Sequence, residues 1–128
     1  MHTNHTLVVV GQGYVGLPVA MRAVAVGFNV VGVDLDVKRT ESLLAGVSDV
    51  DDISNQELQN ALDSGRFLPT ADYARTAGFD VAVITVPTRL RESIPDLSYI
   101  ESSATSLSER LTPGATVVLE STTYPGRP

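Results

Sequence analysis

A β-α-β pattern built around three glycines constrains this chain more than any other feature of its sequence. An apolar run at 7–10 leads into the glycine turn 11–16 (GQGYVG), a helix-like stretch follows, and a second apolar run at 30–33 ends on Asp34. In such a turn the first glycine permits tight bending, the second lets a pyrophosphate approach the backbone, and the third lets the helix pack closely. The helix start offers free N–H groups to phosphates, and the acid can accept hydrogen bonds from a ribose. The pattern therefore predicts a dinucleotide-binding site.

Strands and helices are predicted to alternate along the rest of the chain. We expect strands at 7–10, 29–34, 67–68, 81–86 and 115–120, and helices at 14–26, 37–45, 55–64, from 70 or 71 to 77, and 97–111. Asp36 and Ser54 are the predicted N-caps of the second and third helices. The continuous apolar run at 81–86 is typical of a strand buried on both faces. This alternation favours an α/β fold, a Rossmann-type doubly wound parallel sheet of order 3-2-1-4-5 with helices on both faces.

The composition excludes several other classes of protein. The formal net charge of −6 over 128 residues disfavours nonspecific binding to nucleic acid, because no basic surface is available to offset the phosphates. The sequence has no cysteine, which excludes disulfides, thiolate metal sites and a cysteine nucleophile within it. Polar residues and glycines interrupt the apolar stretch at 7–33, so a buried β-α-β unit explains it better than a membrane span. We expect a soluble, cytoplasmic protein of one domain.

Candidate ligand-binding residues follow the predicted strands, since ligands of such sheets bind outside the carboxyl ends of the strands. Asp34 is the predicted ribose ligand, and its carboxylate would repel a 2′-phosphate, which favours NAD over NADP. Arg39 follows it closely in sequence. Thr88 and Thr122 place hydroxyls after the fourth and fifth strands, toward a nicotinamide ribose or a substrate. The acidic segment 49–52 lacks the glycine and distal glutamate of a calcium loop, so no metal site is expected.

Several longer segments give the chain a resemblance to a known family. They read GYVGLP at 13–18, GVD at 32–34, VPT at 86–88, PDLSY at 95–99 and ESTTYPG at 120–126. With these segments the chain resembles the N-terminal NAD-binding domain of the UDP-glucose/GDP-mannose dehydrogenases, the nucleotide-sugar 6-dehydrogenases. The likeness is greatest to the branch acting on UDP-N-acetylglucosamine or UDP-N-acetylmannosamine. Arg89 departs from the pattern, standing where the family usually has the second proline of Val-Pro-Thr-Pro, and the tail reads PGRP.

The resemblance implies a two-step oxidation of a sugar C6 alcohol to a carboxylate with two NAD+. The family's cysteine, lysine and glutamate would lie beyond Pro128, so residues 1–128 are expected to be a fragment that holds NAD without completing turnover. The central helix and the sugar-binding domain would be absent from it, and the full-length enzyme is expected to be a homodimer. Two alternatives remain open: a UDP-glucose or GDP-mannose 6-dehydrogenase, and a non-catalytic NAD-sensing module.

The resemblance also implies which residues contact the cofactor. They belong to the glycine turn, the ribose acid and its neighbourhood, and the ends of the fourth and fifth strands: Gly11, Gln12, Gly13, Tyr14, Val15, Gly16, Asp34, Arg39, Thr88 and Thr122. Thr122 matches a family threonine that helps to position the catalytic water, which implies a supporting catalytic role.

Overall fold

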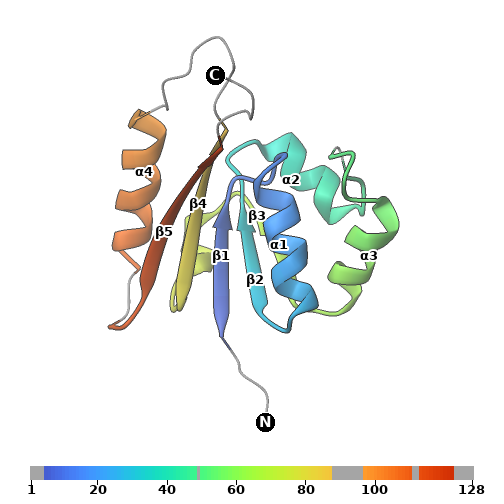
Figure 1. Cartoon of the computed structure of the whole chain (residues 1–128), viewed down its shortest axis with the longest axis horizontal. Helices are drawn as coiled ribbons and strands as arrows, with labels where there is room; N and C mark the ends of the chain where they lie inside the picture. The colour runs from blue at the N-terminus through green and yellow to red at the C-terminus, as the bar shows by residue number, and fades with distance from the viewer. Residues whose placement is uncertain (1–4, 49, 88–96, 111–112, 123–128) are drawn as a thin grey trace.

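The computed structural model describes residues 5–48, 50–87, 97–110 and 113–122, which form one sheet with helices on both faces. Figure 1 shows its five parallel strands: β1 (Thr6–Val10), β2 (Asn29–Val33), β3 (Phe67–Thr70), β4 (Val81–Pro87) and β5 (Thr116–Thr122). Their order is β3-β2-β1-β4-β5, which confirms the predicted order. The order of the strands changes direction between β1 and β4, so β1 lies at the centre of the sheet. Ligands of such folds bind outside the carboxyl ends of the strands at this switch point.

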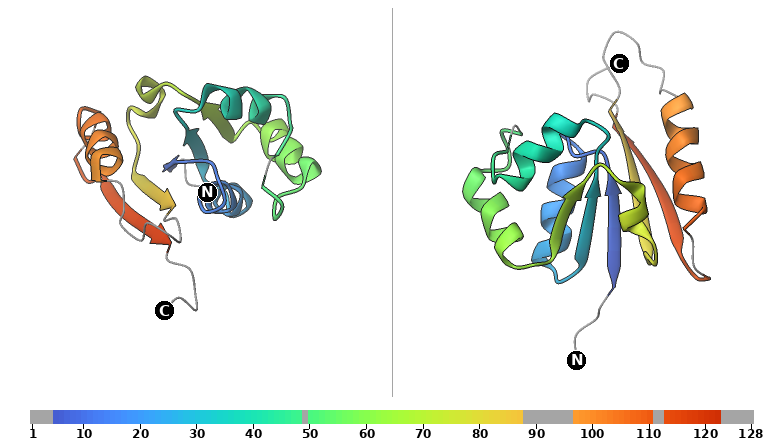
Figure 2. Two further views of the ribbon diagram at one scale, coloured as in Figure 1. Left: turned by 90° about the horizontal axis from the view of Figure 1, so that it is seen from above. Right: turned by 180° about the vertical axis from the view of Figure 1, so that it is seen from behind.

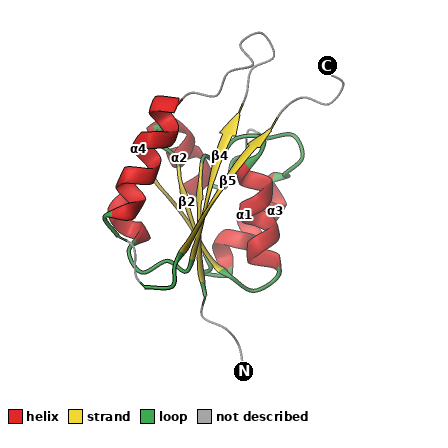
Figure 3. Cartoon of the chain, turned by 60° about the vertical axis from the view of Figure 1, so that its left-hand side comes forward, coloured by secondary structure: helices red, strands yellow, loops and turns green. Residues whose placement is uncertain are grey.

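The helices pack in two layers. They are α1 (Gly16–Ala25), α2 (Val37–Leu44), α3 (Asn55–Asp63), the short 3₁₀ helix η1 (Tyr73–Thr76) and α4 (Leu97–Ser108). Seen close to edge-on, α1 and α3 lie on one side of the sheet and α4 on the other (Figure 3). The view from above shows the same arrangement, with the strands fanning from β5 to β3 between the layers (Figure 2).

The core consists of two apolar clusters separated by the sheet, and β1 supplies both. Val9 belongs to the cluster that includes Leu17 of α1, whereas Val8 and Val10 belong to the one that includes Leu107 of α4. Because successive side chains of a strand point to opposite faces, a strand covered on both sides needs apolar residues at every position. None of the helices in the described part of the chain combines the length and the apolar character that a membrane span requires.

Helix boundaries follow local capping chemistry. Asp36 and Ser54 are the N-caps of α2 and α3, as predicted: Asp36 accepts from the Arg39 N–H at 3.2 Å and Ser54 from the Glu57 N–H at 3.0 Å. The predicted helix from 70 or 71 to 77 is wrong in its start and type. β3 continues to Thr70, and the following Asp72 caps a single 3₁₀ turn.

Candidate functional site at the carboxyl edge of the sheet

The glycine turn between β1 and α1 is closed by two of its glycines. Gly11 has a φ of +93°, and its N–H donates to the Val33 carbonyl of β2 at 2.7 Å. Gly16 is the first residue of α1, two residues later than predicted. A Cβ at Gly16 would lie 1.5 Å from the Gly11 carbonyl oxygen, so only glycine lets the two ends of the turn approach this closely.

The middle of the turn presents backbone N–H groups at an open surface. Val15 precedes α1 as its N-cap and supplies no side-chain cap. Among the described residues, the N–H groups of Gly13 and Tyr14 donate to no other residue. Of the residues that the structure describes, a Cβ built at Gly13 would meet a single atom within 4 Å, the Arg39 Nη1 at 3.6 Å, and Tyr14 is 72% exposed. Uncapped N–H groups at a helix start form an anion-binding site.

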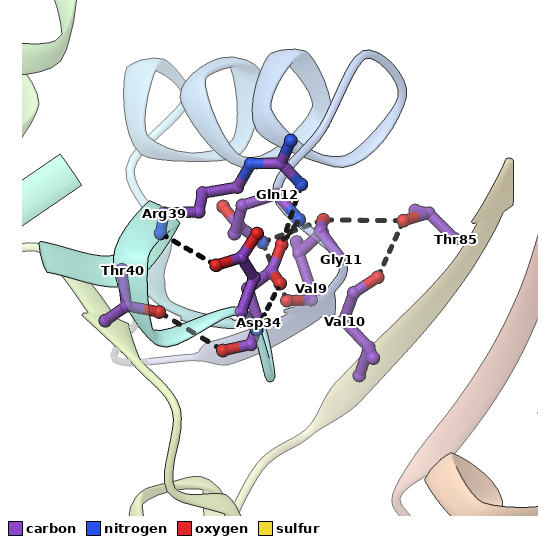
Figure 4. A network of polar contacts seen from close by, with 9 residues as sticks. Val9, Val10, Gly11, Gln12, Asp34, Arg39, Thr40 and Thr85 are labelled. Atoms are coloured by element: carbon purple, nitrogen blue, oxygen red, sulfur yellow. Dashed lines mark hydrogen bonds and ion pairs between the residues drawn. The ribbon is translucent and has the colours of Figure 1, made fainter. Parts of the chain in front are cut away.

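Asp34 ties the end of β2 to the glycine turn (Figure 4). Its N–H continues the sheet by donating to the Thr70 carbonyl at 3.0 Å. One carboxylate oxygen, Oδ2, accepts from the Gln12 N–H at 2.8 Å, and the other, Oδ1, accepts from the Asp36 N–H at 2.9 Å. A carboxylate has about four acceptor positions. Oδ2 also accepts from Arg39 Nη1 at 3.4 Å, so the described residues use three of these positions and leave one, on Oδ1, for a hydroxyl, although the side chain is only 11% exposed.

Arg39 extends from the first turn of α2 to the same carboxylate. Its Nη1 lies 3.4 Å from Asp34 Oδ2 and, as noted, next to the open face of Gly13. Thr40, the next residue, donates its hydroxyl to the Asp34 carbonyl at 3.1 Å. The start of α2 thus fixes both the main chain and the side chain of the predicted ribose acid.

The Gln12 side chain turns inward from the glycine turn and is fully buried. Its Nε2 donates to the carbonyls of Val9 at 2.9 Å and Gly11 at 3.0 Å. The amide needs the space over Gly32 of β2, where a Cβ would lie 2.7 Å from the Gln12 Cδ. The Gln12 N–H donates to Asp34, and its side chain is buried beneath the turn. Gln12 therefore stabilises the conformation of the turn.

Thr85 is a member of the site that the sequence placed both in the apolar strand 81–86 and in the strand-end segment 85–88, without assigning it a role of its own. It lies near the end of β4, is 2% exposed, and donates its hydroxyl to the Val10 carbonyl at 2.6 Å. Its Oγ1 also lies 3.4 Å from the Gly11 carbonyl oxygen. The signal in the sequence was a lone hydroxyl within the apolar run VAVITV.

The remaining predicted residues lie at the ends of β4 and β5 or outside the described part. Thr122 is the last residue of β5, and its backbone is in register with Pro87 of β4. Thr88 and Arg89 lie outside the described residues, as does Asp49 of the acidic segment. Where the structure describes the chain, no group of three or more histidine, cysteine or acidic residues is arranged to hold a metal ion.

One ionisable side chain near the site has a shifted pKa. Burial raises the pKa of Tyr73 above its ordinary value of 10.0; the nearby Ser103 side chain of α4 lowers it in part, and the Asp34 carboxylate adds to the rise. The Tyr73 hydroxyl makes no hydrogen bond of standard geometry to the described residues.

A parallel sheet of order 3-2-1-4-5, a glycine turn opening a helix and an acid after the second strand together define a Rossmann-type dinucleotide-binding domain. Residues 5–127 match the family model described as the UDP-glucose/GDP-mannose dehydrogenase family, NAD binding domain. The chain belongs to this family, and the cofactor of this domain is NAD.

Known relatives of the chain are nucleotide-sugar dehydrogenases. It is 33% identical over 121 residues to the UDP-N-acetyl-D-mannosamine dehydrogenase of Pyrococcus horikoshii, covering 94% of this chain and 29% of the relative. It is 34% identical over 119 residues to the UDP-N-acetyl-D-glucosamine 6-dehydrogenase of Pseudomonas aeruginosa, covering 92% and 27%. The chain thus spans under a third of the length of these relatives.

Solved structures of the same class share the fold. The UDP-D-ManNAc dehydrogenase of Pyrococcus horikoshii superposes with a TM-score of 0.79 at 31% identity, over 94% of this chain and 29% of that one. A ternary complex of the GDP-mannose dehydrogenase of Pseudomonas aeruginosa gives 0.76 at 28% identity, over 94% and 29%.

Proposed function

We propose that the chain binds NAD with the pyrophosphate over Gly13 and the start of α1 and with the adenosine ribose on Asp34. The observation that carries the proposal is the hydrogen bond from the Gln12 N–H to Asp34 Oδ2 at 2.8 Å, which joins the ribose acid to the phosphate turn. The residues fit the group: within the described part of the chain only Arg39 Nη1 lies near the face of Gly13, and one acceptor position of the Asp34 carboxylate is left.

Each remaining residue of the predicted set has a role in this proposal. Gly11 and Gly16 give the turn its shape, and Gln12 supports it from inside. Tyr14 and Val15 contribute backbone N–H groups rather than side chains. The Tyr14 ring is exposed, and the Val15 side chain makes no capping hydrogen bond to α1.

Arg39 lies beside the ribose and the second glycine in the proposed complex. We assign Thr88 and Thr122 to the nicotinamide end of the cofactor, with Thr122 in a supporting catalytic role. The support for this last assignment is their place after β4 and at the end of β5, at the edge of the sheet where ligands of this fold bind.

The carboxylate at the ribose position selects NAD over NADP in this proposal. A 2′-phosphate brought against Asp34 would meet a negative charge that is 11% exposed and therefore poorly screened. Arg39 would offset part of the repulsion, although its guanidinium already lies 3.4 Å from the same carboxylate.

Isothermal titration of the chain with NAD+ and with NADP+ tests the cofactor site. We expect preferential binding of NAD+ and a loss of at least tenfold in affinity, about 1.4 kcal/mol, in Asp34→Ala. The matched control is Asp36→Ser, which removes an exposed carboxylate two residues away and keeps a side chain able to cap α2. Equal affinities of wild type and Asp34→Ala for NAD+ would refute the assignment of the ribose site.

For the whole protein we propose a nucleotide-sugar 6-dehydrogenase, of which residues 1–128 are the NAD-binding domain. It would be a cytoplasmic homodimer that oxidises the C6 alcohol of UDP-N-acetylglucosamine or UDP-N-acetylmannosamine to a carboxylate. The support is the family match together with relatives that bear these substrate names. When bound, NAD supplies the hydride acceptor. The part of this chain is to hold the dinucleotide in a fixed orientation at the carboxyl edge of the sheet.

The activity proposal is tested on the full-length protein by following NADH at 340 nm with four separate substrates. These are UDP-N-acetylglucosamine, UDP-N-acetylmannosamine, UDP-glucose and GDP-mannose. We expect two molecules of NADH per molecule of one of the N-acetylated substrates. Turnover of UDP-glucose or GDP-mannose alone would correct the substrate, and no turnover of any of the four would refute the activity.

A further inference from the structure

Thr85 is the polar residue of the otherwise apolar strand β4, and its hydroxyl is bonded inside the protein. The neighbouring β4 residues Ala82 and Ile84 pack in the apolar cluster on the α4 face, whereas Thr85 points to the α1 face, beneath the glycine turn. The turn and Thr85 lie 74 positions apart in sequence. A short hydrogen bond of 2.6 Å to the Val10 carbonyl joins them.

The same hydroxyl lies against both ends of the turn. Its oxygen is 3.4 Å from the Gly11 carbonyl oxygen at the start, and a Cβ at Gly16 would come within 3.0 Å of it at the end. Figure 4 shows Thr85 on the far side of this segment from Arg39 and Asp34. The turn is therefore held between Asp34 of the β2 end and Thr85 of β4.

Two buried donors hold the carbonyl groups under the turn. The Thr85 hydroxyl donates to Val10, and the Gln12 amide donates to Val9 and Gly11. A carbonyl oxygen turned outward would repel a phosphate, whereas N–H groups attract it. Holding the Val10 and Gly11 carbonyls inward fixes the peptide units at the start of the turn, whose N–H groups, those of Gly11 and Gln12, point the opposite way and donate to the Val33 carbonyl and to Asp34. This fixed start in turn sets the position of the next part of the turn, where the N–H groups of Gly13 and Tyr14 lie.

From this geometry we propose that Thr85 is a positioning residue for the pyrophosphate: it acts through the Gly11 turn without touching the cofactor. The inference rests on the proposed NAD site and adds to it a residue from β4. Its specific consequence is that loss of the hydroxyl weakens the binding of ligands that have a pyrophosphate. The binding of adenosine, which has none, is unaffected, because adenosine reaches Asp34 but not Gly13.

Two variants at one position test the proposal. Thr85→Val keeps the shape and β-branching of the side chain but removes the donor, and Thr85→Ser keeps the hydroxyl and removes a methyl group. Affinities for ADP-ribose and for adenosine are measured on each by NMR titration of the chain. We expect Thr85→Val to lower the affinity for ADP-ribose at least fivefold, while its affinity for adenosine stays within twofold of wild type. Thr85→Ser should retain most of the affinity for ADP-ribose.

Amide hydrogen exchange without ligand gives a second readout of the same variants. Exchange in the segment 11–16 should be at least threefold faster in Thr85→Val than in wild type, with segment 55–63 of α3 unchanged. Equal weakening of ADP-ribose and adenosine, or unchanged binding of ADP-ribose by a folded Thr85→Val, would overturn the inference and leave the NAD site in place. Failure of the wild-type chain to bind ADP-ribose would overturn the proposed function itself, and this inference with it.

Discussion

Replacing Gly13 by alanine tests whether this glycine is needed for ligand binding rather than for folding. Among the described residues a Cβ at Gly13 would meet only Arg39 Nη1, at an ordinary contact distance of 3.6 Å, and the flexible end of that side chain can move aside. The φ of Gly13 is not positive, so alanine can adopt its backbone conformation. We therefore expect the free energy of unfolding of Gly13→Ala to stay within about 0.5 kcal/mol of wild type.

Binding should respond quite differently from folding. If the pyrophosphate lies on the backbone of Gly13, the new methyl group occupies its place and forces the ligand or the turn to shift. Overpacking of this kind costs about 1–3 kcal/mol, which is a loss of roughly 5- to 150-fold in affinity. Urea unfolding followed by calorimetric titration with NAD+ measures both quantities on one sample. A Gly13→Ala variant that binds NAD+ as tightly as wild type would refute the placement of the pyrophosphate.

Gly16→Ala is the matched comparison, three residues further along the same turn. Its Cβ would lie 1.5 Å from the Gly11 carbonyl oxygen, about half of the smallest separation that real contacts show. The atom it meets belongs to the backbone, so the turn itself must move by more than an ångström. We expect destabilisation by about 1–3 kcal/mol or more, together with loss of NAD+ binding. Near-wild-type stability of Gly16→Ala would show that the turn is not as tightly closed as its geometry indicates.

The other predictions concern the support of the site. Gly32→Ala should destabilise the chain by about 1–3 kcal/mol in urea unfolding, because its Cβ would lie 2.7 Å from Gln12 and 2.9 Å from Phe67. A smaller effect would mean that the buried amide can move aside. Tyr73 has a pKa raised by burial, so its contribution to stability is complete below pH 10 and is lost as the pH rises through the folded-state pKa. The difference between the alkaline titrations of wild type and Tyr73→Phe, followed by phenolate absorbance, should show one tyrosine ionising above pH 10; a component at or below pH 10 would contradict the shift.

The strand order and the glycine turn could be predicted because each depends on local patterns with a single structural solution. The apolar run at 81–86 and the β-α-β unit at 7–34 admit few arrangements other than a parallel sheet with right-handed crossovers. Asp36 was predicted correctly as a helix cap for a similar reason, since capping involves residues three positions apart. Such patterns can be recognised without knowing what lies nearby in space.

The support of the turn could not be predicted, because it depends on contacts between distant segments. Gln12 occupies a position of the glycine motif at which many residue types are allowed. The motif therefore does not indicate where its side chain points. The amide is buried because Gly32 leaves room for it, 20 positions away. A glycine within an apolar strand often marks such a close approach, and Gly32 was the available signal.

The affinity of the site should therefore depend on the sheet as much as on the motif. The carboxyl ends of three strands converge on residues 11–16: β1 leads into the turn, β2 contributes Asp34 and the space at Gly32, and β4 contributes Thr85. Each contact lies in the ordered core, so the N–H groups of the turn are already aligned before a ligand arrives. A site aligned in advance loses less conformational entropy on binding. Two chains with the same three glycines can consequently differ in cofactor affinity through residues that never touch the cofactor.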